Sequence, residues 1–192
     1  MFITTIADNV FSYYNISMFS DPIKNVEQSG IHPGMEVADF GSGSGHYSTA
    51  VARALMSTGR VYAIDIQKDL LSTLKNTATR EGLYNIEVIW GDISKINGTR
   101  LKDNSVDFVV ISNLLFQIEN KADVVKEAKR ILKGGGKVLL VDWADSFGGI
   151  GPKPGAVLTQ LKATEMFEKE GFHIDQEISA GSHHYGLIFK KL

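Results

Sequence analysis

The chain has 192 residues, 43% of them hydrophobic, and its formal net charge is −2. This length is enough to bury one core, so we expect a single domain, and the near-neutral charge gives no electrostatic reason to expect nucleic acid as a partner. The chain contains no cysteine, which excludes disulfides, thiolate metal sites and cysteine nucleophiles.

No apolar run approaches the ~18 residues of a membrane-spanning helix, and we expect no membrane span. The first basic residue is Lys24, so the start lacks the positively charged region of a secretory signal. With the absence of cysteine, these features favour a cytoplasmic location.

A helical cap segment is predicted over residues 1–33, ahead of the core domain at residues 34–192. The apolar spacing from Ile3 to Phe11 indicates one helix, and Asp21-Pro22 is typical of the cap and first position of another.

Five short apolar runs rich in β-branched residues follow, nearly continuous rather than alternating. This pattern is typical of strands that are buried on both faces of a parallel sheet. The expected strands cover Met35–Phe40, Val61–Asp65, Ile86–Trp90, Val106–Ile111 and Lys137–Asp142.

Helical spacing of apolar residues separates these runs, and Gly82 and Gly134 are predicted to stop two of the helices. The third crossover, Gly91–Asn104, is the least regular. Repeated strand–helix units predict a doubly wound α/β sheet.

The last part of the chain is predicted to hold a helix at about 156–170 and a pair of strands around Ile174–Ser179 and Tyr185–Lys190. Gly181 lies near the turn of the hairpin between them.

Three glycines mark the corner after the first predicted strand, which ends in Asp39. Gly41, Gly43 and Gly45 occupy every second position, and a helical pattern begins after them. Such a corner brings a ligand close to bare backbone and to the free N–H groups of a helix start. A dinucleotide site needs G-x-G-x-x-G, but the sixth position here is His46. A turn that only lets strand and helix pack is the alternative.

Polar residues also end the next three strands. Asp65 and Asp92 follow the second and third strands, and Ser112 and Asn113 close the fourth. Ligands of open α/β sheets bind at this edge. The alternative for the two acids is capping of the following helix or turn.

These features together resemble the class I S-adenosylmethionine-dependent methyltransferases, over about Ile31 to Leu192. "VADFGSGSG" resembles their first motif, "AID" their acidic second motif, "GDIS" the third and "DFVVISNLLFQI" the fourth, while "ILKGGGKVLLVDW" resembles the element that follows in the small-molecule branch. The resemblance implies a Rossmann-like sheet of seven strands in the order 3-2-1-4-5-7-6, with strand 7 antiparallel and helices on both faces. It also implies S-adenosylmethionine as cofactor.

The resemblance assigns the methionine half of the cofactor to the glycine corner. Gly41 and Gly43 would let it approach the backbone, Asp39 would brace the loop and favour the ammonium group, and Asn113 would contribute through its backbone. Further contacts are expected from Ser42, Tyr47 and His46.

The adenosine half is assigned to the next two strand ends. Asp65 would hold the ribose hydroxyls, and Ile66 would pack on the adenine. Asp92 would accept a hydrogen bond from the adenine amino group, with Ile93 beside the ring.

The expected reaction is methyl transfer to a small molecule by in-line displacement, without a metal, because a methyl sulfonium is already activated. Asn113 is followed by Leu114-Leu115-Phe116 rather than Pro-Pro and an aromatic residue, which argues against adenine-N6 or glutamine methylation. The alternatives are a protein or RNA substrate, a nicotinamide-dependent oxidoreductase, and a domain that binds the cofactor without turnover. The acceptor and the oligomeric state stay open.

A base is needed only if the acceptor arrives protonated. An antiparallel seventh strand would start beside the end of the fifth, so one of His183 and His184 could face Asp142. We expect His184 to be that residue and the carboxylate to raise its pKa. Two solvated hairpin histidines and a capping Asp142 are the alternative.

Two segments flanking this edge are predicted to act as lids: Met1–Ser20, which is rich in aromatic residues, and Asp145–Gly155, which is rich in glycine. A plain core helix and a plain surface loop are the alternatives.

Overall fold

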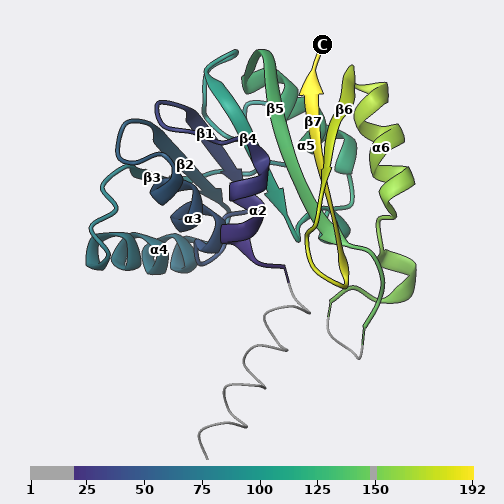
Figure 1. The fold of residues 1–192 in the computed structure, drawn as a ribbon, viewed down its shortest axis with the longest axis horizontal. Coiled ribbons are helices and arrows are strands. Elements are labelled where there is room, and N and C mark those ends of the chain that lie inside the picture. Colours follow the sequence, from purple (N-terminus) through teal and green to yellow (C-terminus); the bar gives the residue numbers. More distant parts are fainter. Residues whose placement is uncertain (1–19, 148–150) are drawn as a thin grey trace, which may run out of the picture.

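The computed structural model describes residues 20–147 and 151–192, and so nearly all of the predicted first lid and the centre of the second lie outside the described residues. Figure 1 shows one sheet between two layers of helices. The elements are α2 (Pro22–Ser29), β1 (Glu36–Phe40), α3 (His46–Ala54), β2 (Arg60–Asp65), α4 (Lys68–Arg80), β3 (Ile86–Trp90), β4 (Val106–Ser112), the 3-10 turn η1 (Leu115–Gln117), α5 (Lys121–Ile131), β5 (Leu132–Trp143), the 3-10 turn η2 (Pro154–Ala156), α6 (Gln160–Lys169), β6 (Phe172–Ile178) and β7 (His184–Lys191).

The sheet order is β3-β2-β1-β4-β5-β7-β6, which confirms the predicted topology. Strands β1 to β5 are parallel to one another, and β7 runs antiparallel to both β5 and β6. The carboxyl ends of the five parallel strands therefore meet at one edge of the sheet. The start of β7 lies at that same edge.

Alternation along β1 sends its side chains to two different cores. Val37 faces the cluster formed with α2 and α3, whereas Ala38 and Phe40 face the cluster formed with α5 and α6. Asp39 lies between them on the strand, and the alternation turns it toward α3. The sheet is thus buried on both faces, as the continuous apolar runs predicted.

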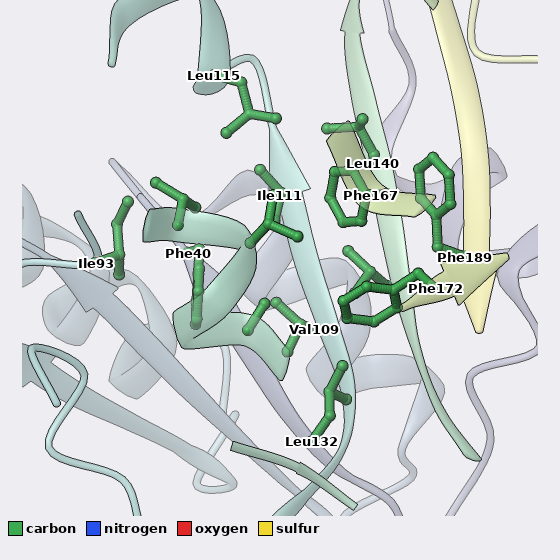
Figure 2. Close-up of a cluster of buried hydrophobic side chains, with 14 of the residues drawn as sticks. Phe40, Ile93, Val109, Ile111, Leu115, Leu132, Leu140, Phe167, Phe172 and Phe189 are labelled. Atoms are coloured by element: carbon green, nitrogen blue, oxygen red, sulfur yellow. The ribbon is translucent and has the colours of Figure 1, made fainter. Parts of the chain in front are cut away.

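Aromatic packing joins α6 to the last two strands (Figure 2). The rings of Phe167 and Phe189 stack with centroids 4.2 Å apart, and Phe172 meets Phe167 edge-on at 5.5 Å. All three side chains are buried, and they hold the β6–β7 hairpin to the rest of the core.

The predicted helix stop at Gly134 is wrong. Helix α5 ends at Ile131, and Leu132 is already extended and begins β5. Ile131, the last residue of α5, and Leu132, the first residue of β5, are both fully buried, and the chain passes from helix to strand between them. Gly134 lies in the exposed first part of the strand. At Gly82, by contrast, the left-handed backbone (φ 70°) follows the end of α4 as predicted.

The third crossover contains no helix or strand between β3 and β4. It is held by the buried Glu127 of α5, which accepts hydrogen bonds from the backbone of Asn97 at 2.8 Å and the hydroxyl of Thr99 at 2.6 Å, and pairs with Arg130 at 2.8 Å. Burial pushes the pKa of Glu127 upward, but these bonds outweigh it and hold the pKa below its usual value. The irregular crossover is therefore firmly anchored.

Within the described ranges, no helix combines the length and the apolarity that crossing a bilayer requires.

Candidate functional site

The glycine corner turns tightly over the end of β2. The backbone N–H groups of Gly41 and Ser42 both donate to the carbonyl of Ile64, at 2.9 and 3.0 Å. Gly41 has φ 67°, and a Cβ there would lie 2.7 Å from Leu114 Cδ1. Gly43 has φ 54° and nothing closer than 4.0 Å around the place of its missing Cβ, so its backbone faces open space.

Asp39 is fully buried where β1 meets α3. Its carboxylate accepts a 2.6 Å hydrogen bond from the hydroxyl of Ser48, in the first turn of α3. Burial raises the pKa of Asp39 to about 7, and the Ser48 hydrogen bonds only partly oppose that rise. The group therefore titrates near neutral pH.

Asp65 ties the end of β2 to the glycine loop. One carboxylate oxygen accepts from the N–H of Gly43 at 2.9 Å, and the other from the N–H of Gln67 at 2.8 Å. The N-cap residue of α4 is Gln67, so Asp65 does not have the helix-capping role that the sequence analysis gave as its alternative. It braces both loops at once.

Asp92 and the two isoleucines surround a neighbouring space. Asp92 accepts from the hydroxyl of Ser94 at 2.6 Å and pairs with Lys95 at 2.9 Å, and these two contacts lower its pKa. Ile66 is 61% exposed, whereas Ile93 is buried.

Asn113 has left-handed backbone (φ 51°) directly after β4. Its N–H donates to the carbonyl of Val141, and its own carbonyl accepts from the side chain of Gln117, both at 2.8 Å. Its side-chain oxygen is buried and has no hydrogen-bond partner within residues 20–147 and 151–192. A buried orphan oxygen of this kind indicates a place where a polar ligand group can bind.

Two adjoining hollows bring all eleven predicted cofactor residues together, and they share Gly41, Gly43 and Asn113. The first, of about 420 Å³, is lined by Ser20, Pro22, Asp39, Gly41, Ser42, Gly43, Ser44, His46, Tyr47, Ser112 and Asn113. The second, of about 520 Å³, is lined by Gly41, Gly43, Asp65, Ile66, Gln67, Leu70, Asp92, Ile93, Ser94, Asn113, Leu114, Gln117 and Ile118.

A network at the first hollow was missed by the sequence analysis. The side-chain amide of Asn25 donates to the hydroxyls of Tyr47 at 2.7 Å and Ser20 at 2.8 Å, and those two hydroxyls lie 3.0 Å apart. Asn25 is buried on α2, and burial raises the pKa of Tyr47. A polar residue on the apolar face of the predicted helix was the available signal.

The expected Asp142–His184 pair is not formed. The β5–β7 register places His184 opposite Trp143 and Tyr185 opposite Asp142, and adjacent strand residues point to opposite faces. The imidazole of His184 lies against the Trp143 ring at 4.3 Å, and neither ring nitrogen has a hydrogen-bond partner among the described residues. Burial lowers its pKa to about 4, opposite to the rise that a neighbouring carboxylate would cause.

The other members of this corner have different partners from those expected. His183 contacts Asp145 at 3.0 Å and stacks on Phe147 at 3.9 Å. Asp142 accepts from the N–H of Trp143 at 2.9 Å, while its second oxygen and the hydroxyl of Tyr185 are buried without partners in the part of the chain that the structure describes. Burial raises the pKa of Asp142 to about 6 and raises that of Tyr185 as well.

The sheet order, the antiparallel seventh strand and the glycine corner beside an acid at the end of β2 define a class I S-adenosylmethionine-dependent methyltransferase. Residues 31–183 match the family model of a methyltransferase domain, and the chain belongs to that family.

Among curated relatives, the chain is 30% identical to the ubiquinone/menaquinone biosynthesis C-methyltransferase UbiE of Hydrogenovibrio crunogenus, over 79% of this chain and 65% of the relative. It is 31% identical to the demethylmenaquinone methyltransferase of Staphylococcus aureus, over 61% of this chain and 46% of the relative. The aligned parts thus span about half to two thirds of these relatives' lengths.

Solved structures agree with this class. A SAM-dependent methyltransferase from Aquifex aeolicus superposes with a TM-score of 0.83 and 25% identity, and the match covers all of both chains. The [4+2]-cyclase SpnF superposes with a TM-score of 0.73 at 15% identity, covering 87% of this chain and 79% of that one. The second likeness concerns the fold alone.

Proposed function

We propose that this protein transfers a methyl group from S-adenosylmethionine to a small-molecule acceptor. The observation that carries the proposal is the pair of adjoining hollows at the carboxyl edge of the sheet, lined by all eleven residues that the family resemblance assigns to the cofactor. Ligands of open α/β sheets bind at this edge.

The described residues fit the cofactor. The open space beside Gly43 admits a ligand against bare backbone, and the partnerless oxygens of Ser42 and Asn113 belong to residues that line the first hollow. Each oxygen of Asp65 accepts one backbone N–H, which leaves lone pairs for ribose hydroxyls. Asp39 lines the first hollow, where the ammonium group of the bound cofactor would stabilise the ionised form of its carboxyl group.

When bound, the cofactor supplies a methyl group on a sulfonium, which needs no metal or nucleophilic triad for activation. The protein aligns the acceptor and excludes water from the first hollow. Asp142, with a pKa near 6, is better suited to accept a proton at neutral pH than His184, with a pKa near 4. The catalytic roles of Asp142, His183 and His184 stay predictions.

The acceptor proposed for first testing is a quinol-type ring carbon. The relatives are named as C-methyltransferases of ubiquinone and menaquinone biosynthesis and as demethylmenaquinone methyltransferases.

The test is calorimetry with S-adenosylmethionine, S-adenosylhomocysteine and NAD, followed by incubation with labelled methyl donor and either demethylmenaquinol or a metabolite extract. We expect both sulfur compounds to bind, NAD not to bind, and label to appear in a small molecule whose mass identifies the acceptor. Binding without any labelled product would leave a cofactor-binding domain and contradict the proposal.

A further inference from the structure

A third hollow, of about 410 Å³, lies at the carboxyl end of the edge strand β3. It adjoins the second hollow, with which it shares Ile66 and Asp92. Its other lining residues come from the end of β3 and the anchored crossover: Trp90, Gly91, Lys95, Asn97, Gly98 and Arg100. The glycine corner contributes nothing to this lining.

The centre of the hollow is an exposed indole with two cations beside it. Trp90 is 49% exposed, and its ring N–H donates to the carbonyl of Ile66 at 3.0 Å, which fixes the ring. Lys68 Nζ lies 4.0 Å and Arg100 Cζ 5.4 Å from the ring centroid. Both distances are within the range of cation–π contacts.

The charge of the hollow is not balanced by its own carboxylate. Lys95 is paired with Asp92, at 2.9 Å. Across residues 20–147 and 151–192, neither Lys68 nor Arg100 forms a salt bridge with a carboxylate. Among the lining residues this leaves the charge of Arg100 unbalanced, and Lys68, at the Trp90 ring, adds a second cation beside the hollow. Two unbalanced positive charges at an aromatic face favour an anion.

The backbone of the crossover holds Arg100 in a conformation that the residue does not prefer. Asn97 and Arg100 have φ of 63° and 61°, in the left-handed region. The bonds that Glu127 makes to Asn97 and Thr99 enforce this arrangement. Strain that a surrounding network maintains is concentrated at functional sites in proteins. In this crossover, the Glu127 network fixes the backbone of Arg100 beside the hollow.

We propose that this hollow is a second ligand site, which binds an aromatic anion next to the cofactor. A flat ring of the ligand lies against the exposed part of Trp90, and its phosphate or carboxylate pairs with Lys68 and Arg100. The site borders the proposed cofactor hollow at Ile66 and Asp92, but binding there is measured without methyl transfer, so its failure can be told apart from failure of the proposed function.

The test uses Trp90 fluorescence. The chain has two tryptophans, so a Trp143→Phe background leaves Trp90 as the single reporter. The protein is saturated with S-adenosylhomocysteine to fill the second hollow and then titrated with adenosine 5′-monophosphate or 1-naphthoate, which carry ring and charge. Adenosine, with the ring alone, and ribose 5-phosphate, with the charge alone, are the comparison probes.

We expect a saturable change with at least one of the two complete probes, and at least tenfold weaker affinity for both incomplete ones. Which complete probe binds distinguishes a nucleotide phosphate from an aromatic carboxylate. Arg100→Gln and Lys68→Gln should each weaken binding at least tenfold, whereas Lys102→Gln, an exposed residue of the same crossover, should leave it unchanged.

Arg100→Gly separates binding from folding, because glycine adopts positive φ without strain. It should raise the melting temperature by about 2–4 °C and abolish the fluorescence response. The proposal is overturned if neither complete probe gives a saturable response, if Arg100→Gln binds as tightly as the parent, or if adenosine binds as tightly as the complete probes.

Discussion

The two ends of the ligand-facing edge of the sheet differ in how their polar side chains are satisfied. At β1 and β2, Asp39 and Asp65 receive hydrogen bonds from Ser48 and from the loop backbone. At β5 and β7, one oxygen of Asp142 and both ring nitrogens of His184 have no hydrogen-bond partner in the described structure. The two acids of the first end are thus fixed before a ligand arrives, with the hydroxyl of Ser42 as the buried group there that has no partner among the described residues. The second end keeps more unused hydrogen-bonding capacity.

The two ends therefore follow different physical rules. A preorganised end binds its ligand at little cost in ordering, and here it lies where we propose the cofactor. Buried polar groups without hydrogen bonds destabilise the ligand-free protein. Such an end is selective, because only a ligand with matching donors and acceptors supplies the missing hydrogen bonds.

The largest expected effect concerns the charge of Asp39. Its pKa is 3.8 in a model peptide and about 7 in the fold, so the folded state binds more protons between these values. Asp39 therefore adds stability below pH 4, and this contribution is lost as the pH rises through about 7, by roughly 2 to 4 kcal/mol. Asp39→Asn should remove that dependence, measured as the difference from the parent in urea unfolding at pH 4 and pH 8 without cofactor. Equal pH dependence in both proteins would show that Asp39 is already ionised.

Asp65→Ala should weaken S-adenosylhomocysteine binding by roughly 1.5–3 kcal/mol, because the ribose hydroxyls lose a charged acceptor and the Gly43 loop loses its brace. Calorimetry measures the affinity. Asp69→Ala, in the exposed first turn of α4, is the matched control and should bind as the parent does. An unchanged affinity in Asp65→Ala would reduce Asp65 to a purely structural role.

At the other end, His184→Phe should stabilise the acceptor-free protein by about 1 to 2 kcal/mol at pH 7, because it removes two buried nitrogens without partners and keeps a ring against Trp143. The pKa of His184 is about 4 in the fold against 6.5 in a model peptide. The stability that the neutral imidazole contributes to the folded protein is therefore lost as the pH falls from 6.5 toward 4.

The gain from His184→Phe should accordingly grow as the pH falls through that window, which thermal unfolding at several pH values can follow. His173→Phe serves as comparison, since it too carries a buried unpartnered ring nitrogen but lies at the far end of β6. Destabilisation by His184→Phe alone would mean that the imidazole has a partner.

The smallest effect is expected for His183→Gln. The contact between His183 and Asp145 lies at the surface, where a pair contributes little. Turnover should stay within about threefold of the parent, less than roughly 0.7 kcal/mol of barrier. A larger loss, with a changed pH–rate profile, would make His183 the base and shift attention away from Asp142.

The sequence predicted the first end well because its information is local. Each polar residue there lies at or next to the carboxyl end of a strand, and parallel strands bring their carboxyl ends together whatever their exact register. Asp39, Asp65, Asp92 and Asn113 therefore came to two adjoining hollows as expected.

The second end could not be predicted in the same way, because it depends on the register of an antiparallel pair. A shift of one residue exchanges the faces, so the pairing of Asp142 with Tyr185 rather than His184 depends on how the whole β7 strand packs. The link from Asn25 to Tyr47 likewise joins residues far apart in the sequence, and Gly134 was misread because burial at Leu132 decides where α5 ends.

The place of β7 in the sheet has a consequence for how the protein is made. The chain completes β5, then β6, and only afterwards supplies the strand that lies between them. At usual rates of translation, the edge of β5 stays unpaired for roughly two to ten seconds after its synthesis. An open apolar edge is a template for pairing with other chains. Chaperone contact and aggregation of nascent molecules should therefore concentrate on this half of the sheet.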